Sequence, residues 1–326
     1  MASNTALRWT LAGDEAQATL FDDGLPSGAR DLPTVEYLHV RARKIISSVP
    51  AASQMPFRHT INAYRGCTHA CVYCFARPTH AYLDLDPGDD FERRIVVKVN
   101  AVERLRAELR APSWAGEWIA MGTNTDPYQP AEGRYRLTRG AIEALSAVRN
   151  PFSILTKSTM VLRDLDLLVE ASRRTSVRVD LSIGTLDEHV WRTSEPGTPP
   201  PLQRIEAVRR LNEAGVECGV FVAPVLPGIS DAPAQLEAVV NASIDAGAVS
   251  LSTVILHLRP GVRELFLPWL QRERPDLVAS YDALYASPSG YAPQEFRRAH
   301  AGRIASLTRA AGGQPATRMP AKYTDE

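Results

Sequence analysis

Short apolar or β-branched runs alternate with longer stretches of helical periodicity through the middle of the chain. Strands are predicted at residues 59–64, 117–121, 152–156, 177–183, 217–222 and 250–255. Helices are predicted between them, at residues 101–110, 138–149, 162–172, 202–214 and 234–246. In the third of these helices, leucines recur at spacings that fit one helical face. Successive βα units of this kind predict a parallel sheet with right-handed crossovers.

Six βα units fall short of the eight that close a TIM barrel. We therefore expect an α/β fold whose core, residues 56–258, is a partial (βα)6 TIM-like barrel. Residues 1–55 are interpreted as a partly irregular N-terminal extension, because residues 22–34 are rich in Gly, Pro and Asp. Residues 37–47 fit either a strand or a short helix. Residues 259–326 are predicted to form a C-terminal helical cap and tail.

The charge balance and the hydropathy of the chain argue against several classes of function and location. The 326 residues include 37 Lys plus Arg and 37 Asp plus Glu, so the formal net charge is zero. A nucleic-acid partner gains little support from this balance, because sequence-independent binding relies on a basic surface. The N-terminus lacks the basic start and apolar core of a secretory signal, and no apolar run approaches the roughly 18 residues of a membrane span. A cytoplasmic protein without a membrane partner is expected.

Three of the four cysteines fall within eight residues, as Cys67, Cys71 and Cys74. Thiolates are soft ligands that select zinc, copper(I) or iron–sulfur clusters. A ferredoxin-type [4Fe–4S] site uses four cysteines, so a cluster here would leave one iron open to a small molecule. The alternative is a structural zinc site with His69 or His80 as the fourth ligand. The triplet alone leaves both interpretations open.

The C-x3-C-x-aromatic-C motif after the first predicted strand resembles that of the radical S-adenosylmethionine (SAM) superfamily. The segments YRGCTHACVYCFARPTH, GTNTDPYQPAE, ILTKS, DLSIGTLD, EPGTPPPLQRI and PVLPGISD together are similar to the spore-photolyase-like branch of that superfamily, across residues 55–260. Many members of this branch are labelled DNA repair photolyases.

The resemblance implies a [4Fe–4S] cluster on Cys67, Cys71 and Cys74, whose fourth iron is chelated by SAM. It also implies reductive cleavage of SAM to a 5′-deoxyadenosyl radical. The electron would come from a reducing donor such as a flavodoxin- or ferredoxin-like protein. Tyr73, the aromatic residue of the motif, would lie near the adenine.

Polar residues follow the second predicted strand, where barrel-like folds open their active-site mouth. Gly122, Thr123, Asn124 and Thr125 occupy the place where members of the superfamily contact the SAM amino group. The same residues are also ordinary turn formers before Asp126-Pro127. Both interpretations are kept.

Lys157 follows the third predicted strand and would be expensive to bury without a partner. The resemblance makes the SAM carboxylate its partner, whereas a structural reading pairs it with Asp180 or Asp126. Ser182, at the end of the fourth strand, would reach the SAM carboxylate or ribose, although serine in a strand is also common for structural reasons.

Cys218 begins the fifth predicted strand and is interpreted as a small core residue. In spore photolyase a cysteine just beyond the second strand returns a hydrogen atom to the product, and this chain reads GTNTDPYQ there. We therefore predict a radical SAM enzyme that acts on an unknown substrate, with its catalytic residues beyond the cofactor site unidentified. The alternatives are a DNA photoproduct lyase-like repair enzyme and a non-enzymatic zinc-binding protein.

Overall fold

A computed structural model describes residues 9–11, 35–50 and 55–315 of the chain. The irregular segment expected at residues 22–34 and most of the expected C-terminal tail lie outside the described residues. Of the helices in the described ranges, none is long and apolar enough to cross a membrane.

The main sheet has seven strands in the order β11-β10-β9-β8-β7-β4-β3. Six of them correspond to the predicted strands and run parallel, in chain order: β4 (His59–Ile61), β7 (Ile119–Met121), β8 (Phe152–Thr156), β9 (Val177–Ser182), β10 (Cys218–Val225) and β11 (Leu251–Ile255). The seventh, β3 (Ile46–Ser48), pairs antiparallel with β4. The predicted parallel α/β fold is thereby confirmed.

Apolar residues of the central strands are fully buried, including Ile119, Ile154, Val179 and Val220. Helices between the strands agree closely with the predicted ranges: α2 (Ala101–Leu109), α4 (Leu137–Ala147), α5 (Leu165–Arg174), α7 (Pro201–Glu213) and α8 (Pro233–Asp245). Helix α5 begins later than predicted because a 3-10 helix, η3 (Thr159–Asp164), precedes it. Short helices α3 (Ala131–Tyr135) and α6 (Glu188–Ser194) add to this pattern.

A second, four-stranded sheet was not predicted. Its order is β1 (Trp9–Leu11), β2 (Glu36–Ala42), β6 (Arg94–Lys98) and β5 (Tyr64–Arg65). The first predicted strand is therefore split, because its end at Tyr64 leaves the main sheet and pairs with β6. The segment at residues 37–47 forms strands rather than a helix, and Ile45 and Ile46 are buried in the core. The boundaries at residues 55 and 258 stay a prediction.

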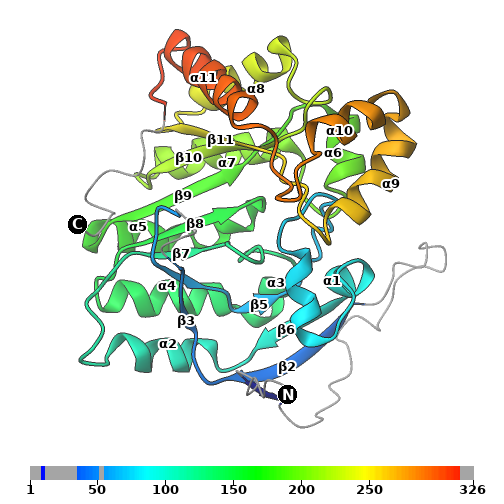
Figure 1. Cartoon of the computed structure of the whole chain (residues 1–326). Coiled ribbons are helices and arrows are strands. Elements are labelled where there is room, and N and C mark those ends of the chain that lie inside the picture. Colours follow the sequence, from blue (N-terminus) through cyan, green and yellow to red (C-terminus); the bar gives the residue numbers. More distant parts are fainter. Residues whose placement is uncertain (1–8, 12–34, 51–54, 316–326) are drawn as a thin grey trace, which may run out of the picture.

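The C-terminal residues are helical, in α9 (Arg263–Glu273), η4 (Pro275–Leu277), α10 (Val278–Leu284) and α11 (Gln294–Ala310). In Figure 1, α9 and α10 lie on the same side of the molecule as α1 (Asp89–Arg93). The turn before α9 passes close to η2 (Arg77–Leu83), because a Cβ at Gly261 would lie 2.8 Å from the Pro78 Cγ. Helix α9 itself approaches the residue before α1, because a Cβ at Gly88 would lie 3.3 Å from Leu265 Cδ2.

Candidate functional site

The cysteine loop begins where β5 ends. Gly66 has φ +81°, and a Cβ there would lie 2.8 Å from the Phe91 carbonyl oxygen, so glycine suits this position. Two turns follow, in which Ala70 N donates to Cys67 O (3.3 Å) and Cys74 N donates to Cys71 O (3.2 Å). The C-x3-C-x2-C spacing thus folds as consecutive turns, which keep the three cysteines on one short loop.

Buried side chains fix this loop from the neighbouring segment after β7. Thr125 Oγ1 and Gln129 Nε2 both donate to Gly66 O, at 2.6 and 3.0 Å. Gln129 Oε1 in turn accepts from Thr68 N at 3.2 Å. Thr125 was predicted as part of the polar segment after the second strand, whereas Gln129 was given no role, although it lies in the quoted GTNTDPYQPAE segment.

Arg77 is a second support that sequence reasoning missed. Its side chain is 1% exposed, and its Nε donates to Cys71 O at 3.0 Å. Its NH1 donates to Gly88 O at 3.1 Å, and its NH2 forms an ion pair with Glu92. One guanidinium therefore ties the middle of the cysteine loop to the start of α1.

Cys67 and Cys71 are buried, and Cys74 is half-buried. Burial raises the pKa of all three thiols; the charge of Asp126 raises the pKa of Cys67 further, that of Glu195 raises the pKa of Cys71, and the neighbouring cysteines add a smaller increase at both. The thiols therefore lie within electrostatic reach of one another, and metal binding here must release their protons.

Among the residues that the structure describes, no three His, Cys, Asp or Glu side chains are grouped as a metal site. The fit of this loop to a metal centre rests on its donor chemistry. Three cysteines on one wrapped loop supply the thiolates that iron–sulfur clusters take. The donor set therefore fits a cluster.

The two histidines considered as a fourth zinc ligand contact other groups. His69 Nδ1 lies 3.4 Å from Asp126 Oδ2. His80 Nε2 lies 3.1 Å from Arg94 O, and its ring packs edge-on against Phe91. Neither is grouped with the cysteines as a metal site in the described part of the chain.

The structure brings together three of the residues predicted to bind SAM. Lys157 Nζ lies 2.9 Å from Ser182 Oγ and 5.5 Å from the centre of the Tyr73 ring. Its ion-pair partner is Glu195, at 2.9 Å, and Tyr73 also donates its hydroxyl hydrogen to Glu195. Lys157, Ser182 and Tyr73 thus converge from β8, β9 and the cysteine loop around a carboxylate.

The two carboxylates proposed from the sequence as structural partners of the Lys157 ammonium have other roles. Asp180 pairs with Arg178 at 2.7 Å. Asp126 accepts the backbone N–H of Lys157 at 2.8 Å and the hydroxyl of Thr156 at 2.6 Å. Glu195 was missed because it lies in the EPGTPPP segment, which was quoted for the resemblance but given no role.

Glu195 is held as a carboxylate. Burial alone would raise the pKa of Glu195, but the Arg204 and Lys157 cations outweigh it and bring that pKa to about 2. Arg204 NH2 lies 2.6 Å from Glu195 Oε2. The site therefore contains two buried or half-buried cations and one carboxylate between them.

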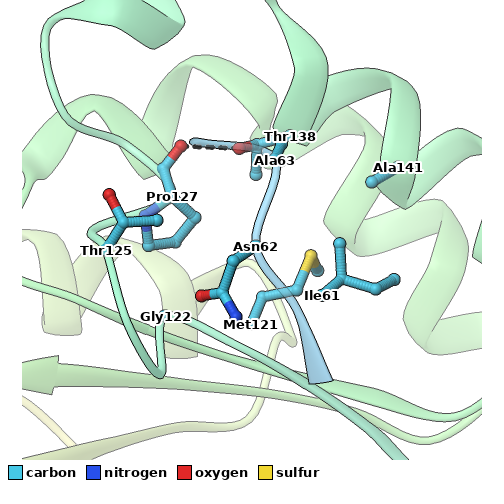
Figure 2. A pocket seen from close by; sticks show the side chains of 9 residues that line it. All are labelled: Ile61, Asn62, Ala63, Met121, Gly122, Thr125, Pro127, Thr138 and Ala141. Carbon is cyan, nitrogen blue, oxygen red and sulfur yellow. Dashed lines mark hydrogen bonds between the residues drawn. The ribbon is translucent and has the colours of Figure 1, made fainter. Parts of the chain in front are cut away.

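Residues 122–124 follow β7, beside β8. Gly122 has φ +92°, and a Cβ there would lie 2.0 Å from Leu155 O. Thr123 Oγ1 lies 3.1 Å from Asn62 Nδ2, and Asn124 N donates to Asn62 Oδ1 at 3.0 Å. Figure 2 shows that Asn62 and Gly122 line a small pocket with Met121. Residues 123 and 124 therefore contact Asn62. Asp126, further along the same segment, contacts the backbone of Lys157.

Cys218 is completely buried and begins β10, whereas Ala223, which contacts Lys157, lies near the end of that strand. The buried position of Cys218 agrees with its prediction from the sequence as a small core residue.

Comparison with known proteins finds one matching family model. The family model of the Radical SAM superfamily matches residues 61–237. An uncharacterised protein of Mycobacterium tuberculosis (strain H37Rv) is 42% identical over 312 residues, which cover 92% of each chain. A radical SAM Nalpha-GlyT isomerase of Pseudomonas phage M6 is 27% identical over 165 residues, which cover 50% of this chain and 32% of the phage protein.

Among solved structures, a spore photoproduct lyase mutant with bound AdoMet and dinucleoside spore photoproduct superimposes with a TM-score of 0.54. The match covers 72% of this chain and 66% of that one, at 20% identity. At this identity the likeness concerns the fold alone.

Proposed function

Because the chain belongs to the radical SAM superfamily, we propose that it binds a [4Fe–4S] cluster through Cys67, Cys71 and Cys74 and uses SAM for radical chemistry. The family predicted from the cysteine motif is confirmed, and membership makes the chain an enzyme whose cofactors are SAM and an iron–sulfur cluster. The substrate is left open.

When bound, the cluster supplies the electron that cleaves SAM to methionine and a 5′-deoxyadenosyl radical. The residues of this chain would bind SAM, orient it and limit the access of water to it. We also propose that the parallel sheet curves as a partial (βα)6 barrel around this site. A flavodoxin- or ferredoxin-like donor would reduce the protein in the cytoplasm.

The observation that supports this proposal best is the convergence of Lys157, Ser182 and Tyr73 beside the cysteine loop. An ammonium and a hydroxyl at 2.9 Å from each other offer a charge-assisted site for the carboxylate of an amino acid, which would replace Ala223 O as the acceptor of one Lys157 N–H and of the Ser182 hydroxyl. Lys157 Nζ also lies 5.5 Å from the centre of the Tyr73 ring, and Tyr73 stands between Cys71 and Cys74 in the cysteine loop. A carboxylate at Lys157 would therefore lie near the cysteine loop.

Thr123 and Asn124 complete the proposed SAM site at the neighbouring strand end. Their side-chain oxygens can accept hydrogen bonds from an amino group. Asn62 holds the segment in place. Gly122 allows it to pass close to the backbone of β8.

We do not propose DNA photoproduct repair, although the fold is similar to that of spore photoproduct lyase. The segment after β7 contains no cysteine, and the likeness reaches only the fold.

The test is anaerobic reconstitution with iron and sulfide, followed by reduction and electron paramagnetic resonance with and without SAM. The proposal predicts about four iron and four sulfide atoms per chain and a spectrum that changes when SAM is added. A protein that holds stoichiometric zinc and no sulfide, with no response to SAM, would contradict it.

Replacing Lys157 with methionine is expected to weaken SAM binding by roughly tenfold to a hundredfold, since a charged hydrogen bond contributes about 1.5–3 kcal/mol. Equilibrium dialysis of cluster-loaded protein with radiolabelled SAM measures the effect. The matched control is Lys44→Met, which removes an exposed lysine between β2 and β3. Equal SAM affinity in the Lys157 variant and the wild type would show that Lys157 does not bind SAM.

A further inference from the structure

The carboxylate of Glu195 is shared by groups that come from separate parts of the chain. Oε1 accepts from Lys157 Nζ at 2.9 Å and from the Tyr73 hydroxyl. Oε2 forms the ion pair with Arg204 at 2.6 Å. The side chains of Glu195 and Arg204 are only 4% and 1% exposed. In such a buried network, loss of one partner leaves an unpaired charge, which is strongly destabilising.

Glu195 contributes directly to the position of the Lys157 ammonium. This group has three N–H donors, and they face Ser182 Oγ, Glu195 Oε1 and Ala223 O, at 2.9, 2.9 and 3.3 Å. The hydroxyl of Ser182 itself donates to Ala223 O at 2.8 Å. Of these three acceptors only Glu195 carries a charge, so it is the strongest determinant of where Nζ lies.

The segment that carries Glu195 is seated on the cysteine loop. Gly197 N donates to His69 O at 3.1 Å, and a Cβ at Gly197 would lie 2.2 Å from Thr68 O. Arg204 fixes the same segment from the other side, because its Nε donates to Pro199 O at 2.9 Å and its NH1 to Ser182 O at 3.0 Å. The position of Glu195 is thereby set by both the cysteine loop and the end of β9.

We propose that Glu195 is a positioning residue for SAM, which acts by holding the Lys157 ammonium and the Tyr73 ring together beside the cysteine loop. The inference rests on the proposed function, because it assumes that SAM binds at Lys157. Lys157 and Arg204 together carry one more positive charge than Glu195 can neutralise. The site thus retains a net positive charge for the carboxylate of SAM.

A double-mutant cycle on SAM affinity tests this role. The dissociation constant of SAM is measured on cluster-loaded wild type, Glu195→Gln, Lys157→Met and the double variant. Glu195→Gln is expected to weaken SAM binding about tenfold in the wild-type background, which corresponds to about 1.4 kcal/mol. In the Lys157→Met background it is expected to have no further effect, because the group through which Glu195 acts is gone.

Glu132→Gln is the matched control. Glu132 is also a fully buried carboxylate that accepts from a tyrosine hydroxyl, that of Tyr64, and pairs with an arginine, Arg163, at 2.9 Å. It belongs to a separate network with α4 and η3. Its replacement is expected to lower thermal stability as Glu195→Gln does, while the SAM dissociation constant stays unchanged.

Glu195→Asp provides a second variant if Glu195→Gln takes up no cluster. It keeps a charge for Arg204 but shortens the side chain, so SAM binding is again expected to weaken in the wild-type background alone. Equal weakening in both backgrounds, or none, would overturn the positioning role, as would loss of the cluster from both Glu195 variants. A wild type that binds a cluster but no SAM would overturn the proposed function itself.

Discussion

Replacing Cys71 with alanine is expected to abolish cluster binding and to lower the rate of SAM cleavage on the order of a thousandfold or more. The cysteine loop supplies three thiolates for the cluster, and a variant with two leaves a second iron without a protein ligand. Cys71 lies at the centre of the loop, where its carbonyl oxygen is already held by Arg77. Iron and sulfide content after anaerobic reconstitution, with the brown visible absorbance of a cluster, measures the first effect.

Cys218→Ala is the control for this prediction. Cys218 is completely buried, more so than the loop cysteines, but it begins β10, away from the loop. It should retain its full iron content, with a loss of stability of about 1 kcal/mol. If the Cys71 variant held as much iron and sulfide as the Cys218 variant, the assignment of the cluster ligands would be wrong.

Replacing Gly122 with alanine is expected to lower the free energy of unfolding by about 3 kcal/mol or more. A left-handed backbone costs a non-glycine residue on the order of 1–3 kcal/mol, and here the new Cβ would also lie 2.0 Å from Leu155 O. Either β7 or β8 must move, and Thr123 and Asn124 move with it. Urea unfolding measures the loss of stability, and SAM affinity reports the displacement of the loop.

Gly116→Ala separates the two contributions. Gly116 has φ +81°, close to that of Gly122, but a Cβ there would have no neighbour within 4 Å. Its replacement should therefore cost only the backbone strain, about 1 kcal/mol, and leave SAM affinity unchanged. Equal losses in the two variants would show that the close approach to Leu155 is unimportant.

Local sequence patterns predicted the main sheet well, because its parallel strands other than β4 are short apolar runs that each precede a helix. The second sheet could not be predicted in this way. Its strand β6 has an apolar run, RIVVK, but lies inside the long connection after the cysteines and pairs with β2, more than fifty residues earlier in the chain. Pairing between strands so far apart in the chain depends on tertiary structure. The spacing of apolar residues along the sequence does not indicate it.

In the candidate site, too, some residues could be predicted from local sequence and others could not. The cysteines, Tyr73, Lys157 and Ser182 stand at motif positions and strand ends, so the sequence could indicate them. The ion-pair partner of Lys157 could not be found locally, because Glu195 lies 38 residues further along the chain. Asn62, which holds Thr123 from 61 residues away, is a similar case. Both are side-chain contacts made only after the strands have assembled.

The most direct test of the central claim is the formation of 5′-deoxyadenosine from SAM. Reconstituted, dithionite-reduced protein is incubated with SAM under anaerobic conditions, and the products are separated by chromatography, with Cys71→Ala in parallel. We predict 5′-deoxyadenosine and methionine from the wild type and neither above background from the variant. A wild type that holds its cluster and binds SAM, yet yields no more 5′-deoxyadenosine than Cys71→Ala under reduction, would contradict the proposal.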